Sequence, residues 1–183
     1  MSFPIDLRLE SKKHQEKLKN IKVALFDADG ILTTGHIYWS GEEVGFNRYF
    51  HTQDGYGLKV LMKAGIKVGV ISGGDSVGLH KRIENLGLNY SFTGSEDKRD
   101  AFKKVLDEGY KASEILYMGD EFFDLPLLKA AGFSATVPNS SHEIQEAVDY
   151  VTYRQSGMGC VREVIDLLRY VQNIVPEIEE LQI

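Results

Sequence analysis

Three short apolar runs mark the chain, and each ends abruptly at polar or glycine residues. They span 21–26, 67–71 and 115–118, and they are followed by Asp27, Ser72 and Gly119. Short apolar runs bounded by turn residues are typical of strands that are buried on both faces of a parallel sheet. Weaker strand candidates are 90–93, 133–137 and 150–152.

Helical patterns separate these runs. Apolar residues recur at helical spacing, and glycines such as Gly65 and Gly87 close several of the segments. The predicted helices span 11–20, 57–64, 77–86, 98–106, 125–131, 144–148 and 161–171. Strands and helices that alternate at this spacing predict right-handed βαβ units and a doubly wound parallel sheet. We therefore predict a single α/β domain over residues 1–183.

One segment interrupts the alternation between the first strand and its helix. Two aromatic-bearing, β-prone runs at 35–40 and 44–51 flank a glycine-containing turn, which predicts a hairpin over about residues 35–50. The hairpin leaves the carboxyl end of the first strand, where open parallel sheets bind ligands. We interpret it as a flap that covers a site or contacts a partner.

Acidic residues follow the first and third apolar runs. Asp27 and Asp29 end the first run, and Asp120, Glu121 and Asp124 follow the third. The carboxyl ends of these strands lie side by side in a doubly wound sheet, so we expect the carboxylates to gather there. Such a cluster needs a cation to stay ionised, and carboxylate oxygens without nearby imidazole or thiolate favour Mg²⁺. A substrate phosphate then becomes a natural further ligand.

Each acid suggests a role in phosphoryl transfer. Asp27 is placed to attack phosphorus and form an aspartyl-phosphate. Asp29 is the candidate that protonates the leaving oxygen and later activates water. Asp120 is expected to hold Mg²⁺ opposite Asp27, with support from Asp124 or Glu121.

A glycine-rich turn and a lysine complete the candidate site. The Ser72 hydroxyl and the amides of Gly73 and Gly74 are expected to receive phosphate oxygens, as a backbone nest does. Lys98 opens a predicted helix and supplies charge to balance the developing negative charge. Each signal alone is typical of an ordinary turn or cap, but their order at successive strand and helix ends indicates one site.

Composition narrows the class of protein. The chain has 21 basic and 27 acidic residues and a net charge of −6, which disfavours a nucleic-acid partner. Its single cysteine can form no internal disulfide and excludes a Cys-based zinc site. No apolar run approaches the roughly 20 residues that cross a bilayer, and residues 1–22 lack the apolar region of a signal peptide. We therefore expect a cytoplasmic protein without a membrane partner.

Taken together, the motifs resemble those of the haloacid dehalogenase superfamily of phosphatases. The matching residues are Asp27-Ala28-Asp29-Gly30-Ile31-Leu32-Thr33, Ser72-Gly73, Lys98 and Gly119-Asp120-Glu121-Phe122-Phe123-Asp124. In that superfamily the first Asp is the nucleophile and the second is the general acid/base. Mg²⁺ is held by the first Asp, the backbone carbonyl of the second and an acid of the fourth motif. The resemblance carries these ligand roles onto Asp27, Asp29 and Asp120.

More narrowly, the chain resembles the capless 3-deoxy-D-manno-octulosonate 8-phosphate phosphatase family. The likeness runs from about residue 21 to 168 and rests on 29–33, Phe50, 54–57, 97–98 and 157–163. It implies a phosphorylated sugar acid as substrate and a place in lipopolysaccharide biosynthesis. It also implies a homotetramer in which the hairpin closes a neighbouring subunit's site. Arg154 and Arg162 are the candidates for recognising the anionic substrate.

Several positions depart from the family's pattern. Thr34 replaces an Asp, Gly74 replaces the Arg of Thr-Gly-Arg, and Gln53 stands where a basic residue is common. Residues 154–159 replace Arg-x-Gly-Gly-x-Gly. These changes spare the phosphoryl chemistry and fall at substrate-facing positions. The alternatives left open are a nonulosonate 9-phosphate phosphatase, a phospho-accepting receiver-like module and a weakened homologue that only binds.

Overall fold

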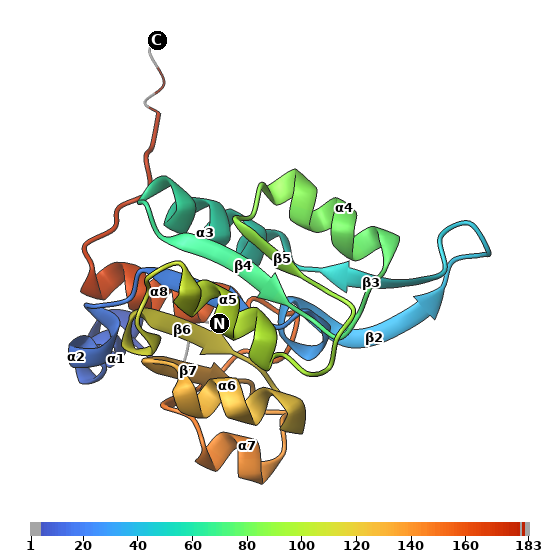
Figure 1. Cartoon of the computed structure of the whole chain (residues 1–183). Coiled ribbons are helices and arrows are strands. Elements are labelled where there is room, and N and C mark those ends of the chain that lie inside the picture. Colours follow the sequence, from blue (N-terminus) through green and yellow to red (C-terminus); the bar gives the residue numbers. More distant parts are fainter. Residues whose placement is uncertain (1–4, 180, 182–183) are drawn as a thin grey trace.

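A six-stranded sheet forms the centre of the computed structural model, which describes residues 5–179 and 181 (Figure 1). The strand order is β5-β4-β1-β6-β7-β8, and every neighbouring pair is parallel. This arrangement confirms the predicted doubly wound α/β fold. The strands are β1 (Val23–Phe26), β4 (Lys67–Ile71), β5 (Tyr90–Phe92), β6 (Ile115–Met118), β7 (Phe133–Thr136) and β8 (Tyr150–Val151).

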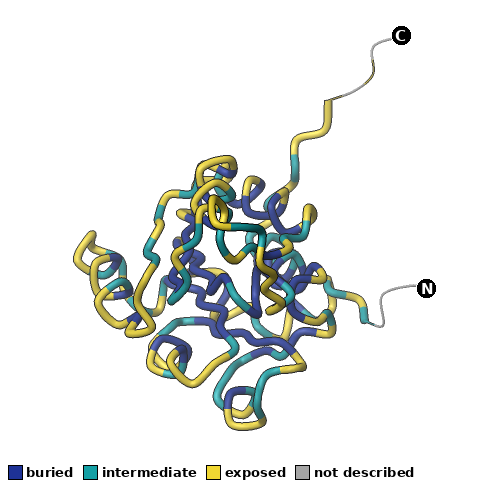
Figure 2. Tube along the Cα trace, turned by 90° about the vertical axis from the view of Figure 1, so that its right-hand side faces the viewer, coloured by how far each residue is buried: buried dark blue, intermediate teal, exposed yellow. Residues whose placement is uncertain are grey.

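Helices cover both faces of this sheet. Successive strand residues alternate between two apolar clusters, so that Phe26 joins one cluster and Leu25 the other. In Figure 2 the buried segments gather in the interior and the exposed ones lie at the periphery. The first cluster includes or packs against residues of α1 (Leu7–Lys13), α2 (Gln15–Leu18), α3 (Thr52–Lys63), α4 (Val77–Leu86) and α8 (Cys160–Val171). The second includes residues of α5 (Arg99–Asp107), α6 (Leu125–Ala130) and α7 (His142–Glu146).

The N-terminal helix differs from the prediction of one helix over 11–20. The structure has two short helices, α1 and α2, which meet at His14. The backbone of His14 leaves helical geometry (φ −108°, ψ 11°), and its ring packs edge-on against Phe133 and Tyr150. The aromatic contacts of His14 thus coincide with the break in the helix.

Helix α3 begins at Thr52, ahead of the predicted start at Gly57. The glycines of its first turns weaken helix propensity and hide the true start in the sequence. In the structure they allow close packing, because a Cβ at Gly57 would lie 3.0 Å from Ile165 of α8. Tertiary contact between α3 and α8 therefore overrides local propensity.

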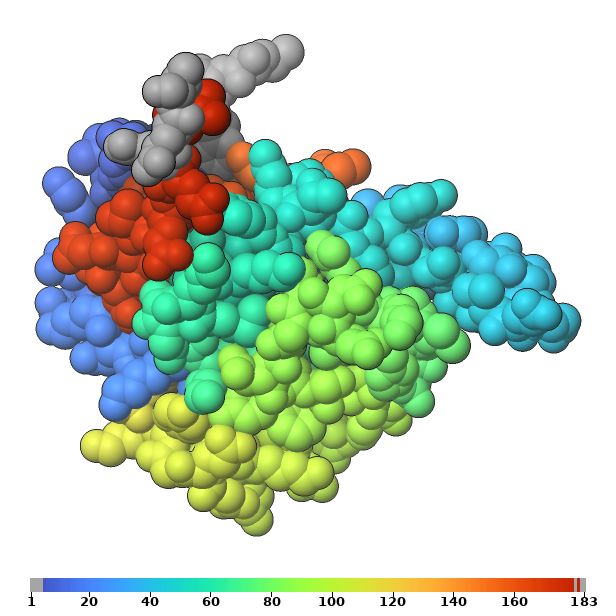
Figure 3. Space-filling model, turned by 90° about the horizontal axis from the view of Figure 1, so that it is seen from above, coloured from blue at the N-terminus to red at the C-terminus, as the bar shows by residue number. Residues whose placement is uncertain are grey.

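Residues 33–50 form a hairpin apart from the main sheet. Its strands β2 (Thr33–Trp39) and β3 (Phe46–Phe50) pair antiparallel, and the hairpin projects beyond the body of the molecule (Figure 3). Near the projecting end, Tyr38 stacks on Tyr49 with ring centroids 5.0 Å apart. The hairpin is therefore held by its own cross-strand contacts. Its action as a flap stays a prediction.

Candidate active site

The loop after β1 carries two acids into different surroundings. Asp27 follows β1 directly, is 2% exposed, and donates its backbone N–H to the Met118 carbonyl at 2.9 Å. The chain then makes a wide turn, η1 (Ala28–Leu32), in which Asp29 (φ −81°, ψ 120°) and Gly30 leave helical geometry. The Asp29 side chain is 35% exposed. Asp27 thus lies in the interior, whereas Asp29 lies at the partly exposed edge of the site.

Lys98 places a positive charge next to the Asp27 carboxylate. Its ammonium lies 2.7 Å from Asp27 Oδ1 and 2.6 Å from Asp124 Oδ1, and its side chain is fully buried. The Phe123 ring lies over the ammonium at 4.6 Å. A buried charge is tolerated only with close partners, so the three charged groups stabilise one another. The buried ammonium fixes the direction of the Asp27 carboxylate.

Asp124 organises the loop after β6. Its Oδ1 accepts from the Tyr117 hydroxyl at 2.5 Å and from Lys98, and its Oδ2 accepts the backbone N–H groups of Asp120 and Glu121 at 3.1 Å each. These four donors hold the carboxylate and the loop together. Tyr117 was not predicted, because it reads as one more apolar member of a buried strand.

A cation fits between Asp27 and Asp120. Carboxylate oxygens of Asp27, Asp120 and Asp124 all lie within 4.8 Å of one another. Among the residues that the structure describes, none donates a hydrogen bond to the buried Asp120 Oδ1, whereas Asp124 already accepts four. Asp27 and Asp120 are therefore the suited ligands, and their hard oxygens match Mg²⁺.

The raised pKa values of Asp27 and Asp120 also indicate a site that favours a bound positive charge. Burial raises the pKa of Asp27 to about 7, opposed by Lys98 and assisted by Asp124. Burial also raises the pKa of Asp120 to about 8, and the charges of Asp27 and Asp124 add to the effect. A bound divalent cation would favour the ionised form of both groups.

Gly30 makes room for Asp120. It has a left-handed backbone (φ +87°), and a Cβ there would lie 2.0 Å from Asp120 Oδ2. We expect Gly30→Ala to displace the Asp120 carboxylate and to lower kcat/KM about 10²-fold, since misplacement by an ångström has costs of this order. Gly65→Ala is the matched control, because Gly65 has a similar φ of +88° but open space at its Cβ. Equal activities of the two variants in a Mg²⁺-dependent phosphatase assay would contradict this role.

Asp29 is held by the hairpin. Arg48 of β3 donates from Nε to Asp29 Oδ1 at 2.6 Å and from Nη2 to Asp29 Oδ2 at 2.7 Å. The Thr33 hydroxyl also donates to Asp29 Oδ1 at 3.3 Å. Arg48 was missed by sequence reasoning. Its signal was a single basic residue in a strand that is mostly aromatic.

The end of β4 forms the predicted turn. Ser72 is 1% exposed, and its Oγ accepts the Gly74 N–H at 3.1 Å. Gly74 lies close to Asp29, since a Cβ on Gly74 would lie 2.9 Å from Asp29 Oδ2. The structure therefore brings the Ser72 turn and Asp29 together. Phosphate binding at Ser72 and Gly73 stays a prediction.

Comparisons with known proteins agree with this geometry. The family model of haloacid dehalogenase-like hydrolases matches residues 92–165. The 3-deoxy-D-manno-octulosonate 8-phosphate phosphatase of Haemophilus influenzae is 38% identical over 161 residues, which cover 86% of this chain and 88% of that protein. The corresponding enzyme of Salmonella typhi is 34% identical over 164 residues, covering 88% and 86%.

The chain belongs to the 3-deoxy-D-manno-octulosonate 8-phosphate phosphatase family. Its structure is similar to that of the Moraxella catarrhalis family member in complex with magnesium, phosphate and KDO, with a TM-score of 0.84 and 34% identity. That match covers 88% of this chain and 93% of the other. The resemblance inferred from the motifs is thus confirmed.

Two arginines of this octulosonate-phosphatase homologue lie beside α3. Arg154 Nη1 donates to Gln53 Oε1 at 3.3 Å. Arg162 donates its backbone N–H to Asp54 Oδ1 at 2.7 Å and its Nε to Asp166 at 2.9 Å. Asp54 thereby caps the amino end of α8 from a neighbouring helix. Recognition of substrate by the two arginines stays a prediction.

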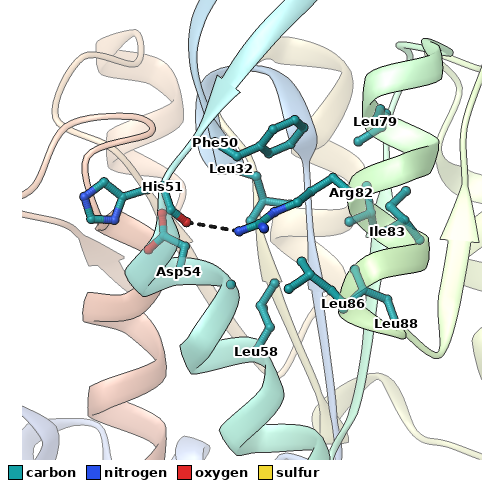
Figure 4. A pocket seen from close by; sticks show the side chains of 12 residues that line it. Leu32, Phe50, His51, Asp54, Leu58, Leu79, Arg82, Ile83, Leu86 and Leu88 are labelled. Carbon is teal, nitrogen blue, oxygen red and sulfur yellow. Dashed lines mark hydrogen bonds between the residues drawn. The ribbon is translucent and has the colours of Figure 1, made fainter.

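A small cavity lies between α3 and α4 (Figure 4). Its volume is about 10 Å³, and its lining is mostly apolar, with leucine the commonest residue. Arg82 extends from α4 toward the His51 carbonyl, which accepts from Nη2 at 3.4 Å. A space of this size holds at most about one water molecule. It is too small for the sugar substrate of a family member.

Among the residues that the structure describes, none of the helices is both long and apolar enough to span a bilayer.

Proposed function

We propose that this protein is a Mg²⁺-dependent phosphomonoesterase that hydrolyses 3-deoxy-D-manno-octulosonate 8-phosphate through an aspartyl-phosphate on Asp27. One observation carries the proposal: the buried Asp27 carboxylate is held by Lys98 at 2.7 Å, beside an Asp120 oxygen that accepts no hydrogen bond from residues 5–179 or 181. The family relationship and the magnesium, phosphate and KDO of the Moraxella catarrhalis structure support the same reaction.

The residues act in two steps. Asp27 attacks phosphorus, the bond from phosphorus to the sugar oxygen breaks, and Asp29 gives its proton to that leaving oxygen. A water molecule then attacks the phosphorus of the aspartyl-phosphate and gives a proton to Asp29. The bond between phosphorus and Asp27 breaks, its electron pair returns to the carboxylate, and inorganic phosphate leaves. Asp29 ends the cycle protonated, as it began.

Charge is balanced around the phosphoryl group. Asp27 and Asp120, with the backbone carbonyl of Asp29, would hold Mg²⁺, which supplies positive charge that opposes the negative charge of the phosphate. Lys98 orients Asp27 from below, with Asp124 as its second partner. Glu121 lies at the exposed start of the turn η3 (Phe122–Asp124), and its negative charge contributes to the raised pKa of Asp120.

Substrate recognition is assigned to a groove beside the hairpin. The groove has a volume of about 550 Å³, and its lining includes Gln155 together with Thr34 and Ser156, two positions that depart from the family's pattern. Their neutral hydrogen-bonding groups suit sugar hydroxyls. Arg154 and Arg162 remain the proposed partners of the sugar-acid carboxylate.

Assembly and location complete the proposal. The exposed apolar side chains of the hairpin, including Trp39 at 53% and Phe46 at 54%, suit a homotetramer in which the hairpin meets a neighbouring subunit's site. The family relationship supports a cytoplasmic enzyme.

A kinetic comparison tests the substrate. We expect kcat/KM for 3-deoxy-D-manno-octulosonate 8-phosphate to exceed that for nonulosonate 9-phosphates by at least ~10-fold, a ratio that differential contacts in a binding pocket can supply. Released phosphate is measured with and without Mg²⁺. A reversed ratio would assign the chain to nonulosonate phosphates. Absence of release from both substrates would favour a protein that only binds phosphate.

A further inference from the structure

Arg48 is an unusual residue of the hairpin. It is the one buried residue of β3, and its side chain is 7% exposed while its neighbours on the strand are half-buried or exposed. A buried guanidinium is costly unless its donors are satisfied. The contacts of Arg48 therefore indicate why a buried arginine stands in the hairpin.

All three guanidinium nitrogens are engaged. Nε and Nη2 donate to the two carboxylate oxygens of Asp29 at 2.6 and 2.7 Å, and Nη1 donates to Ser76 Oγ. Ser76 also caps α4 by accepting the Leu79 N–H at 3.3 Å. The guanidinium is thus anchored to α4 on one side and presents a planar fork to Asp29 on the other. Such a fork fixes both the position and the plane of a carboxylate.

The surrounding backbone leaves room for this pair. A Cβ at Gly74 would lie 2.9 Å from Asp29 Oδ2 and 3.2 Å from Arg48 Nη2. Even a methyl group at position 74 would press against both partners. Gly74, which stands where the family commonly has an arginine, therefore leaves space for the Arg48 guanidinium of the hairpin.

We propose that Arg48 is a positioning residue for the second half of the reaction, holding the Asp29 carboxylate as acceptor for the proton of the attacking water. The inference rests on the proposed function, in which Asp29 is the general acid/base. Water attacks phosphorus, its proton passes to Asp29, and the bond from phosphorus to Asp27 breaks. Asp29 has given up its proton in the first step, and the fork then holds both carboxylate oxygens in place while Asp29 accepts the proton of the water. The hairpin thereby becomes part of the active site of its own subunit.

This role predicts which step slows when Arg48 is changed. With 4-nitrophenyl phosphate the leaving group needs little protonation, so formation of the aspartyl-phosphate proceeds without help from Asp29. The ratio kcat/KM reports that first step, whereas kcat also includes hydrolysis of the aspartyl-phosphate. We expect Arg48→Gln to lower kcat about 10²-fold, the usual scale of general base catalysis, and to leave kcat/KM within about 5-fold.

Rapid mixing gives the decisive readout. In the Arg48→Gln variant we expect a burst approaching one nitrophenolate per active site, followed by slow turnover, because the aspartyl-phosphate accumulates. Arg48→Lys keeps the charge but lacks the fork, so its kcat should lie between wild type and Arg48→Gln. Asp29→Asn should show the same burst. Lys81→Ala, which removes an exposed cation of α4, is the control and should behave as wild type.

The possible failures can be told apart. Equal losses of kcat and kcat/KM without a burst, in folded Arg48→Gln and Arg48→Lys proteins, would overturn the positioning role and leave the proposed function standing. Thermal unfolding of each variant establishes that it is folded. A wild-type protein that releases no phosphate with Mg²⁺ would overturn the proposed function, and this inference with it.

Discussion

Replacing Asp27 by asparagine is expected to remove phosphate release, with kcat lowered by at least ~10⁴-fold, because the substitution takes away the attacking carboxylate. Asparagine keeps the shape of the side chain, but its neutral amide is too weak a nucleophile to attack phosphorus. The loss should be the same for 3-deoxy-D-manno-octulosonate 8-phosphate and for 4-nitrophenyl phosphate. A nucleophile is needed whatever the leaving group is, and this separates Asp27 from Asp29.

The control for this variant must preserve the fold. Asp107→Asn changes an exposed acid at the end of α5 and should retain wild-type kinetics. Thermal unfolding should show that Asp27→Asn is folded, and phosphate release is then measured for both variants. A folded Asp27→Asn protein that keeps a tenth of the wild-type rate would show that another group attacks phosphorus.

The central sheet could be predicted because its strands carry an unambiguous pattern. β1, β4 and β6 are buried on both faces, so each is a compact apolar run that ends where the chain turns. The edge strand β8 also lies where the sequence predicted it, to within one residue, whereas the helix boundaries were harder to place. Their limits depend on contacts such as that of Gly57 with Ile165, which local sequence does not show.

The candidate site was predictable to the extent that topology controls it. Asp27 and Asp120 meet because β1 and β6 are parallel neighbours, and the parallel pairing aligns their carboxyl ends. Arg48 and Tyr117 were not found, since each acts through one polar group on a side chain that otherwise fits its strand. The pair of Arg48 and Asp29 joins residues 19 positions apart and depends on how the hairpin folds back. Such a contact follows from three-dimensional geometry.

The second large effect concerns the metal and pH. The pKa values of about 7 for Asp27 and about 8 for Asp120 lie above the ordinary value of 3.8. Between about pH 4 and these values the folded protein binds more protons than the unfolded chain, so the free energy of unfolding should fall as pH rises. Mg²⁺ binds the ionised carboxylates and should reverse this loss. We expect 10 mM Mg²⁺ to raise Tm by at least ~5 °C at pH 8 and by less than ~2 °C at pH 5.5.

Asp120→Asn separates the metal site from general effects of salt. The variant removes one buried negative charge, so without Mg²⁺ at pH 8 it should unfold at a higher temperature than wild type. It should also lose the rise in Tm on adding Mg²⁺, together with most of the activity, while Asp107→Asn keeps both. Thermal unfolding at the two pH values, with Mg²⁺ or with KCl of equal ionic strength, measures these differences. An Asp120→Asn protein that Mg²⁺ stabilises as strongly as wild type would place the metal elsewhere, because the unpaired oxygen of Asp120 would then have no part in holding it.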